Sequence, residues 1–223
     1  MIHNLITVPD ASSLAARAAE VVADRARAAV DDHGLFTFAV SGGKTPWAMF
    51  AQLTQDDIPW ESVRIFQVDE RVAPNGDPQR NLTNLQQSLG AVPAAVVAMP
   101  VGDVDLERGC LDYAGRIPDR FDLVHLGLGP DGHTASLIPG DPVLDVTDRL
   151  VASTGMYQGH RRMTLTYSAL ARADELLWLI SGADKQEPLA KLLAADPSIP
   201  AGRVEAKHST ILADAAATPG GAR

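Results

Sequence analysis

A short glycine-rich segment carries the residues of this sequence that are best suited to chemistry. The run Gly127-Leu-Gly-Pro-Asp-Gly-His133 presents a histidine two residues after an aspartate. An imidazole can act as a general base near neutral pH, since its unperturbed pKa is about 6.5. Asp131 could fix the tautomer of His133 or contact a substrate, and Gly132 lets a substrate approach the backbone. We therefore predict that His133 is a catalytic base, rather than an ordinary histidine in a turn, and that Gly129 and Gly132 contact the substrate.

A second group of charged side chains directly follows an apolar run. Asp69-Glu-Arg71 places two carboxylates and a guanidinium together after Val63–Val68. Such a triplet can be a solvated, self-paired charge cluster. Its position at the end of a predicted strand favours a site, because ligands of open α/β sheets bind beyond the carboxyl ends of the strands. Asp69, Glu70 and Arg71 are therefore candidate site residues.

Several residues could hold an anion. In Ser41-Gly-Gly-Lys-Thr45, a predicted strand is followed by two glycines and a helix start, an arrangement that offers backbone N–H groups to a phosphate. Lys44 adds a cation and Thr45 a hydroxyl, although an ordinary tight turn capped by Thr45 explains the pattern equally well. Arg162 and Lys185 lie near other predicted strand ends. Each alone is typical of a surface charge, but together with Gly42 and Gly43 they could clamp a phosphate.

Two motifs suggest nucleotide binding and are rejected. Gly43-Lys-Thr45 resembles the end of a P-loop, but that motif needs a glycine five residues before Gly43, where Phe38 stands. Gly127-x-Gly-x-x-Gly132 matches the dinucleotide fingerprint in spacing. A true fingerprint opens a long helix, whereas Pro139-Gly140 stops any helix here after about one turn. The next strand candidate ends in Ser153-Thr154, without the carboxylate that binds a ribose.

The elements that must position these residues alternate along the chain. The sequence predicts helices over 10–33, from Pro46 onward, over 81–89 and over 185–195, and strands over 35–40, 63–68, 95–98, 121–126, 150–153, 163–166 and 176–180. The strands are continuous apolar runs, which is typical of parallel strands buried on both faces. We predict one domain over residues 1–223, of the α/β class, with a mainly parallel, Rossmann-like sheet and helices on both faces. The polar loops after the strands should then converge on one side of the sheet.

Composition narrows the partners and the compartment. The net charge of −9 argues against nucleic acid or an anionic membrane as the main partner, although a few local cations can still dominate a small pocket. The single cysteine, Cys110, is expected to be a buried structural thiol in a reducing compartment. No apolar run approaches the roughly 18 residues of a membrane span, and no signal peptide is visible. We expect a cytoplasmic monomer or homodimer.

Five segments, in this order, resemble 6-phosphogluconolactonases. They are Ser41-Gly-Gly-x-Thr-Pro46, Asp69-Glu-Arg71, Gly127-x-Gly-Pro-Asp-Gly-His-Thr-Ala-Ser136, Arg162-Met-Thr164 and Ser181-Gly-x-x-Lys185. The resemblance spans nearly the whole chain, and the segment from Gly129 to Pro139 is its most specific part. Lys44 and Arg80 depart from the family pattern, which often has Ser or Thr at the first position and Ser at the second.

The resemblance implies hydrolysis of 6-phosphogluconolactone to 6-phosphogluconate in the oxidative pentose phosphate pathway, without a metal or another cofactor. It implies that His133 deprotonates the attacking water and that Asp131 orients the histidine or the sugar. Arg71 would hold the substrate or stabilise developing negative charge. The phosphate would contact Gly42, Gly43, Lys44, Arg162 and Lys185.

Two other functions stay open. A related glucosamine-6-phosphate deaminase or sugar-phosphate isomerase would use a carboxylate such as Asp69 to move a proton on carbon. A non-catalytic sugar-phosphate sensor is the alternative outside enzymes, although the presence of His133 speaks against it.

Overall fold

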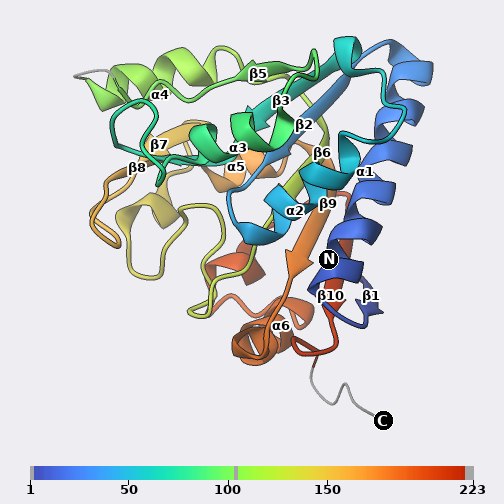
Figure 1. Cartoon of the computed structure of the whole chain (residues 1–223). Coiled ribbons are helices and arrows are strands. Elements are labelled where there is room, and N and C mark those ends of the chain that lie inside the picture. Colours follow the sequence, from blue (N-terminus) through green and yellow to red (C-terminus); the bar gives the residue numbers. More distant parts are fainter. Residues whose placement is uncertain (1–2, 103–104, 219–223) are drawn as a thin grey trace.

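A seven-stranded sheet with the order β1-β10-β9-β6-β2-β3-β5 lies at the centre of the protein, and its neighbouring strands are parallel (Figure 1). The computed structural model describes residues 3–102 and 105–218. The strands of this sheet are β1 (Asn4–Val8), β2 (Phe36–Val40), β3 (Val63–Gln67), β5 (Ala95–Val97), β6 (Phe121–Leu126), β9 (Ala173–Ile180) and β10 (His208–Asp214). The predicted mainly parallel α/β fold is confirmed.

A second, smaller sheet is antiparallel and was not predicted as a separate unit. It has the order β4-β8-β7, with β4 (Asp69–Arg71), β8 (Arg162–Leu165) and β7 (Val151–Ser153). The charged triplet is therefore itself a strand rather than a loop at a strand end. In the register of β4 with β8, Asp69 lies opposite Thr164 and Arg71 lies opposite Arg162. This pairing brings two of the predicted site cations together from segments distant in sequence.

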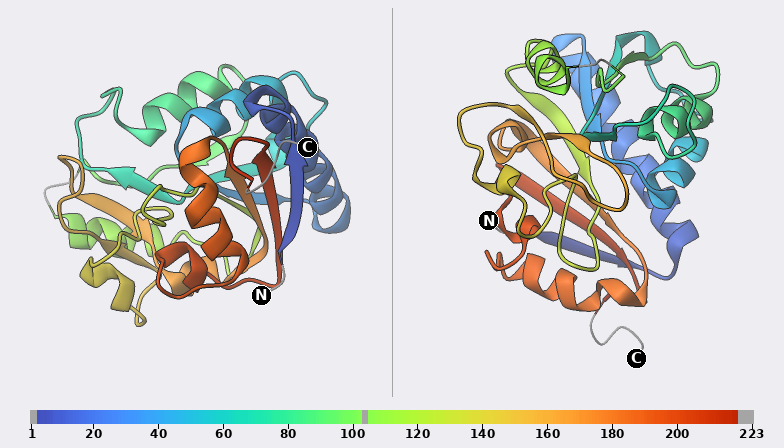
Figure 2. Two further views of the ribbon diagram at one scale, coloured as in Figure 1. Left: turned by 90° about the horizontal axis from the view of Figure 1, so that it is seen from below. Right: turned by 90° about the vertical axis from the view of Figure 1, so that its left-hand side faces the viewer.

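Helices cover both faces of the large sheet, as predicted. Helices α1 (Ala11–His33), α2 (Lys44–Leu53) and α3 (Asn81–Leu89) contribute to one apolar cluster, and α4 (Leu106–Ala114), α5 (Tyr167–Leu170) and α6 (Gln186–Leu193) contribute to the other. Strand β9 shows why its sequence is a continuous apolar run: Leu177 and Leu179 enter the first cluster, whereas Trp178 and Ile180 enter the second. Figure 2 shows helices on the two sides of the strands.

Local signals fix the ends of α1. The Asp10 side chain accepts a hydrogen bond from the Ser13 N–H at 2.8 Å, which satisfies one of the free donors of the first turn. Gly34 ends the helix with φ at 82°, a left-handed conformation that glycine adopts without strain. None of the helices in residues 3–102 and 105–218 is long and apolar enough to cross a membrane.

The start of α2 differs from the prediction. Pro46 was expected to be the first helical residue, but α2 begins at Lys44 and is preceded by Gly43. Proline is tolerated here because the N–H groups of the whole first turn lack partners within the helix. The turn between β2 and α2 is consequently two residues shorter than predicted.

Candidate active site

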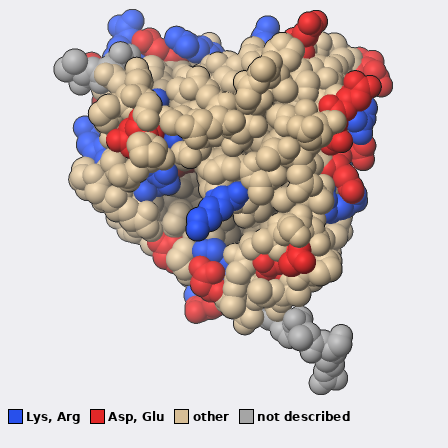
Figure 3. All heavy atoms as spheres, in the orientation of Figure 1, with Lys and Arg blue, Asp and Glu red and all other residues tan. Residues whose placement is uncertain are grey.

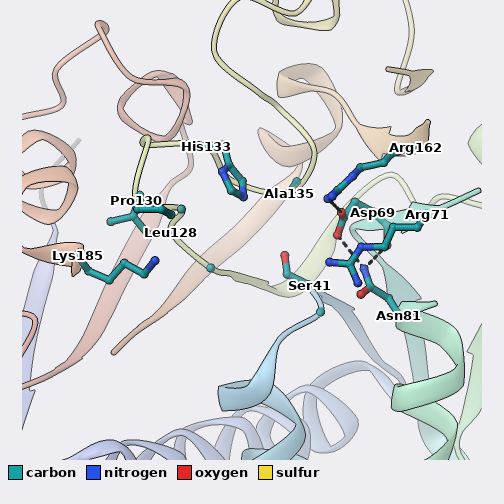
Figure 4. A pocket seen from close by; sticks show the side chains of 13 residues that line it. Ser41, Asp69, Arg71, Asn81, Leu128, Pro130, His133, Ala135, Arg162 and Lys185 are labelled. Carbon is teal, nitrogen blue, oxygen red and sulfur yellow. Dashed lines mark hydrogen bonds and ion pairs between the residues drawn. The ribbon is translucent and has the colours of Figure 1, made fainter. Parts of the chain in front are cut away.

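The segments that follow β2, β3, β6 and β9 converge with the start of β8 around one cavity of about 230 Å³ (Figure 4). The cavity is lined by Ser41, Gly42, Asp69, Arg71, Asn81, Gly127, Leu128, Gly129, Pro130, His133, Ala135, Arg162 and Lys185. The structure thus brings seven predicted site residues to one place: Gly42, Asp69, Arg71, Gly129, His133, Arg162 and Lys185. The expected convergence of the polar loops at the carboxyl ends of the strands is confirmed.

His133 and Asp131 form a hydrogen-bonded pair at the edge of the cavity. The Nδ1 atom of His133 lies 2.5 Å from Oδ1 of Asp131, and the same carboxylate oxygen accepts the backbone N–H of His133 at 3.1 Å. A carboxylate accepts only from a protonated Nδ1, so this pairing makes Nε2 the basic nitrogen. Burial raises the pKa of Asp131, but the hydrogen bonds and charge of His133 and the hydroxyl of Tyr157 outweigh it and hold this pKa below its ordinary value. Asp131 therefore stays a carboxylate.

The turn that carries this pair has no helix after its glycines, which agrees with the rejection of a dinucleotide fingerprint. The Gly129 N–H donates to the carbonyl of His133 at 2.8 Å and closes the turn. Gly132 has φ at 82°, and a Cβ at this position would lie 2.5 Å from side-chain atoms of Ile199. The close approach at Gly132 is therefore to Ile199, not to the cavity, which Gly132 does not line.

Asp69 is held by three neighbours at the floor of the cavity. Its Oδ2 atom accepts the Ser136 hydroxyl at 2.7 Å and lies 3.9 Å from Nη1 of Arg162. Its Oδ1 atom accepts an N–H of the Asn81 side chain at 3.2 Å. Asp69 and Arg162 are only 4% and 3% exposed, so their charges interact in a largely desolvated setting.

Cations approach the cavity from two sides. Figure 4 shows Lys185 reaching in from one side and Arg71 and Arg162 from the other, with His133 between them. Nη1 of Arg71 donates to the carbonyl of Gln79 at 2.7 Å, which leaves other donors of its guanidinium for a ligand. Lys185 pairs with the exposed carboxylate of Asp184 at 2.7 Å. The face of the molecule in Figure 3 is hollowed, and Lys and Arg side chains border the hollow. This local positive charge coexists with the net charge of −9.

The predicted phosphate-binding turn lies only partly in the cavity. Gly42 lines it, but Gly43, Lys44 and Thr45 do not. Gly43 and Lys44 are exposed at the start of α2. The helix begins at Lys44, two residues earlier than expected. The Lys44 side chain therefore extends from the first residue of α2 and not from the turn before it.

Glu70 occupies a different place from the one predicted. It is fully buried and does not line the cavity. Its carboxylate lies 3.0 Å from Nε of Arg80, which is 2% exposed. It also accepts hydrogen bonds from the backbone N–H groups of Arg71, Asn81 and Leu82 and from the Gln67 side chain. Glu70 and Arg80 thus join β4 to the start of α3, which accounts for the arginine that departs from the family pattern.

Glu70→Gln should strongly destabilise the fold. The substitution leaves the buried Arg80 guanidinium without its counter-ion, and breaking a buried pair in this way typically costs about 3–5 kcal/mol. Urea unfolding would measure the free energy of unfolding. The matched control is Glu20→Gln, because Glu20 pairs with Arg17 at the surface. Exposed pairs contribute at most about 1 kcal/mol. Equal losses in the two variants would contradict the role assigned to Glu70.

Three further polar residues at the site were not among the predicted site residues. Ser41 and Asn81 line the cavity, and His125 on β6 contacts Ser41. Nδ1 of His125 accepts the Ser41 N–H at 3.3 Å, and burial lowers the pKa of His125 to about 3. His125 is therefore a neutral acceptor and not a rival base. Among residues 3–102 and 105–218, no group of three or more His, Cys, Asp or Glu is placed to hold a metal ion.

Comparisons with known proteins agree with this architecture. The model of the family described as glucosamine-6-phosphate isomerases/6-phosphogluconolactonase matches residues 9–213. A 6-phosphogluconolactonase of Synechocystis is 37% identical over 199 residues, covering 81% of this chain and 82% of the relative. The crystal structure of 6-phosphogluconolactonase from Thermotoga maritima superposes with a TM-score of 0.86 at 26% identity, covering 95% of this chain and 99% of that one. A monomeric glucosamine-6-phosphate deaminase, at 19% identity, a TM-score of 0.82 and coverages of 96% and 98%, shares the fold. The chain belongs to the glucosamine-6-phosphate isomerase/6-phosphogluconolactonase family.

Proposed function

We propose that this protein hydrolyses 6-phospho-D-glucono-1,5-lactone to 6-phospho-D-gluconate, the lactone-opening step of the oxidative pentose phosphate pathway. The observation that carries the proposal is the His133–Asp131 pair at a cavity bordered by Arg71, Arg162 and Lys185. A positioned base and local cations suit a phosphorylated ester. The relatives named 6-phosphogluconolactonase support the same activity.

His133 acts as the general base in the proposed reaction. Asp131 accepts a hydrogen bond from the Nδ1–H group, so Nε2 is free to take a proton from water as the water oxygen attacks the lactone carbonyl carbon. The carbonyl oxygen gains negative charge, which Arg71 stabilises from the cavity wall. The ring oxygen then leaves and receives the proton from His133, which opens the lactone to the acid. No covalent intermediate is needed, because a lactone is already an activated ester.

The substrate phosphate binds through cations and backbone N–H groups that reach the cavity. Gly42 lies beside the start of α2, where N–H groups have no partner within the helix. Lys185 and Arg162 supply positive charge on two sides of the cavity. Asp214 fixes the turn before Lys185: it accepts the Ser181 hydroxyl at 2.5 Å and the Gly182 N–H at 3.1 Å.

Lys185→Ala should raise KM for the lactone by roughly 10–100-fold, the equivalent of a hydrogen bond to a charged group. The expected change in kcat is small, because Lys185 does not touch His133. Lys44→Ala should have a much smaller effect, since Lys44 is exposed outside the cavity. Lys191→Ala, on the exposed side of α6, is the control. Steady-state kinetics of all three variants checks this. A KM for Lys44→Ala as high as that for Lys185→Ala would place the phosphate outside the cavity.

The geometry favours a lactonase over a deaminase. A deaminase would need a carboxylate free to take a proton from carbon. Asp69 is the carboxylate that lines the cavity, and both its oxygens already accept hydrogen bonds, from Ser136 and from Asn81. These two hydrogen bonds hold the carboxylate in place, so it is not free to reach a proton on carbon.

The deciding experiment measures acid release from freshly made 6-phosphogluconolactone in a pH-stat. We expect the purified protein to accelerate release well above the spontaneous rate, and an unchanged rate would refute the proposal. A parallel assay of ammonia release from glucosamine 6-phosphate tests the deaminase. Binding of 6-phosphogluconate without turnover of either substrate would identify a sensor.

The remaining proposals concern the number of domains, the cellular location and the oligomeric state. We infer one catalytic domain over residues 1–223, a cytoplasmic location and a monomer or homodimer. The matched range of 9–213 supports the single domain. The buried Cys110, whose pKa burial raises to about 12, is an inert thiol that suits a reducing compartment. Light scattering of the full chain would determine its oligomeric state.

A further inference from the structure

We propose that Tyr157 is a positioning residue for the reaction, with two separable roles: its hydroxyl orients Asp131 and its ring orients Arg162. Tyr157 lies in the segment between β7 and β8, outside the motifs that suggested the function. The proposal rests on the proposed lactonase activity. It assigns the segment 154–161 a part in the active site.

The hydroxyl of Tyr157 completes the hydrogen bonding of Asp131. It donates to Oδ2 of Asp131 at 3.2 Å, while His133 occupies Oδ1 through both its ring and its backbone N–H. The two oxygens of the carboxylate are thus fixed from opposite sides. Burial, followed by the charge of Asp131, raises the pKa of Tyr157, so its hydroxyl keeps the proton that it donates.

The ring of Tyr157 contacts two other groups of the site. Its centroid lies 5.6 Å from that of His133, at an interplanar angle of 70°. This edge-to-face geometry is favourable for aromatic pairs and restricts rotation of the imidazole. The guanidinium carbon of Arg162 lies 5.1 Å from the same centroid, within the range of a cation–π interaction. One side chain therefore touches the predicted base, its carboxylate partner and a predicted phosphate ligand.

The loop is shaped to deliver this side chain. Tyr157 and His160 exchange backbone hydrogen bonds at 3.0 and 3.2 Å across Gln158 and Gly159, both of which have positive φ. The side chain of Gln158 accepts from Arg162 at 3.4 Å. The neighbouring Met156 is 68% exposed, so the tight turn holds Tyr157 against the site while its neighbour remains in solvent.

Tyr157→Phe tests the hydroxyl alone. We expect kcat to fall roughly tenfold, the low end for a hydrogen bond to a charged group, with KM almost unchanged. The acid limb of kcat/KM should also move to higher pH. The Tyr157 hydroxyl stabilises the charged form of Asp131, so its removal makes the carboxylate more basic and strengthens its hold on a protonated His133 ring. The groups that affect the charge of Asp131 are His133 and Tyr157. Tyr157 in turn is affected by Asp131 and Arg162. The other charged groups around Arg162 are Asp69, Arg71 and Glu70.

Tyr157→Leu tests the ring as well. This variant should show the same fall in kcat and also a several-fold rise in KM, because Arg162 loses the aromatic ring over which its guanidinium lies.

Tyr167→Phe is the matched control. Tyr167 donates its hydroxyl to the carbonyl of Pro200 at 3.0 Å and lies under Arg203 at 4.8 Å, so it has the same two kinds of contact outside the cavity.

The outcomes separate this inference from the proposed function. Wild-type protein without lactonase activity refutes the proposed function. Active wild-type protein together with a Tyr157→Phe variant of unchanged kcat and pH profile refutes the inference alone. A fall in kcat with no shift of the acid limb also refutes the inference, since a general loss of structure would lower activity at every pH. Circular dichroism and thermal unfolding of each variant show whether the fold is intact.

Discussion

Replacing His133 with alanine should lower kcat for lactone hydrolysis by about 10²–10⁴-fold, the usual contribution of a positioned general base. The imidazole is half-buried at the edge of the cavity, and its Nδ1 atom is held by Asp131 at 2.5 Å. Without it, a water molecule at the carbonyl carbon has no group to take its proton. KM should change little, because the cations that are proposed to hold the phosphate remain. Steady-state kinetics by pH-stat, with the spontaneous rate subtracted, gives both constants.

The controls for His133 distinguish loss of a base from loss of a hydrogen bond. His133→Asn keeps a side-chain N–H that can donate to Asp131 but has no basic nitrogen, so it should be about as inactive as alanine. His33→Gln removes a different histidine–aspartate pair, in which Nε2 of His33 lies 3.0 Å from Oδ1 of Asp122. Asp122 lies near the amino end of β6, whereas the cavity lies at the carboxyl ends of the strands. Full activity in His133→Ala would contradict the proposed mechanism.

Most elements could be predicted because their signals are local. Helix α1 has an aspartate cap and a glycine stop, and β6 has apolar residues at four of its six positions directly before a glycine-rich segment, so their predicted bounds agree closely with the structure. Strand β10 was missed although it lies between β1 and β9 in the large sheet. Its sequence, His-Ser-Thr-Ile-Leu-Ala-Asp, begins with three polar residues and ends in a fourth. Its burial comes from pairing with both neighbours, a long-range effect that no local pattern reveals.

The distinction between local signals and long-range contacts also explains which site residues could be predicted. His133, Asp69 and Arg71 lie in compact motifs after strands, where the topology of a parallel sheet predicts a binding site. Glu70 has the same local setting, yet alternation along β4 turns its side chain away from the cavity and toward Arg80. The triplet was expected to be a loop, and a loop gives no such alternation. Tyr157 lies in no motif, and only the fold of the β7–β8 segment brings it to Asp131.

Gly129→Ala should lower kcat strongly, although it adds only a single methyl group to the candidate active site. The φ angle of Gly129 is not in the left-handed region, so the backbone itself would accept alanine. The obstacle is space, because a Cβ at Gly129 would overlap Nδ1 of His133 and lie 2.7 Å from Oδ1 of Asp131. The methyl group therefore occupies the position of the hydrogen bond between Asp131 and His133, the proposed base. The pair must separate, and a displacement of about 1 Å in a catalytic group can cost roughly 10²-fold in rate.

Gly127→Ala is the matched comparison, since a Cβ at Gly127 would have no heavy atom within 4 Å. It should keep the His133–Asp131 pair and lose far less of kcat, even though it adds the same methyl group to the same turn. Kinetics of both variants, with the imidazole resonances of His133 followed by NMR, separates the two effects. A Gly129→Ala protein with normal kcat would mean that catalysis does not need the pair in the observed geometry. In that case Gly129, one of the three glycines of the fingerprint spacing, would not have the role proposed for it. That role is to leave room for the Asp131 carboxylate beside the His133 imidazole.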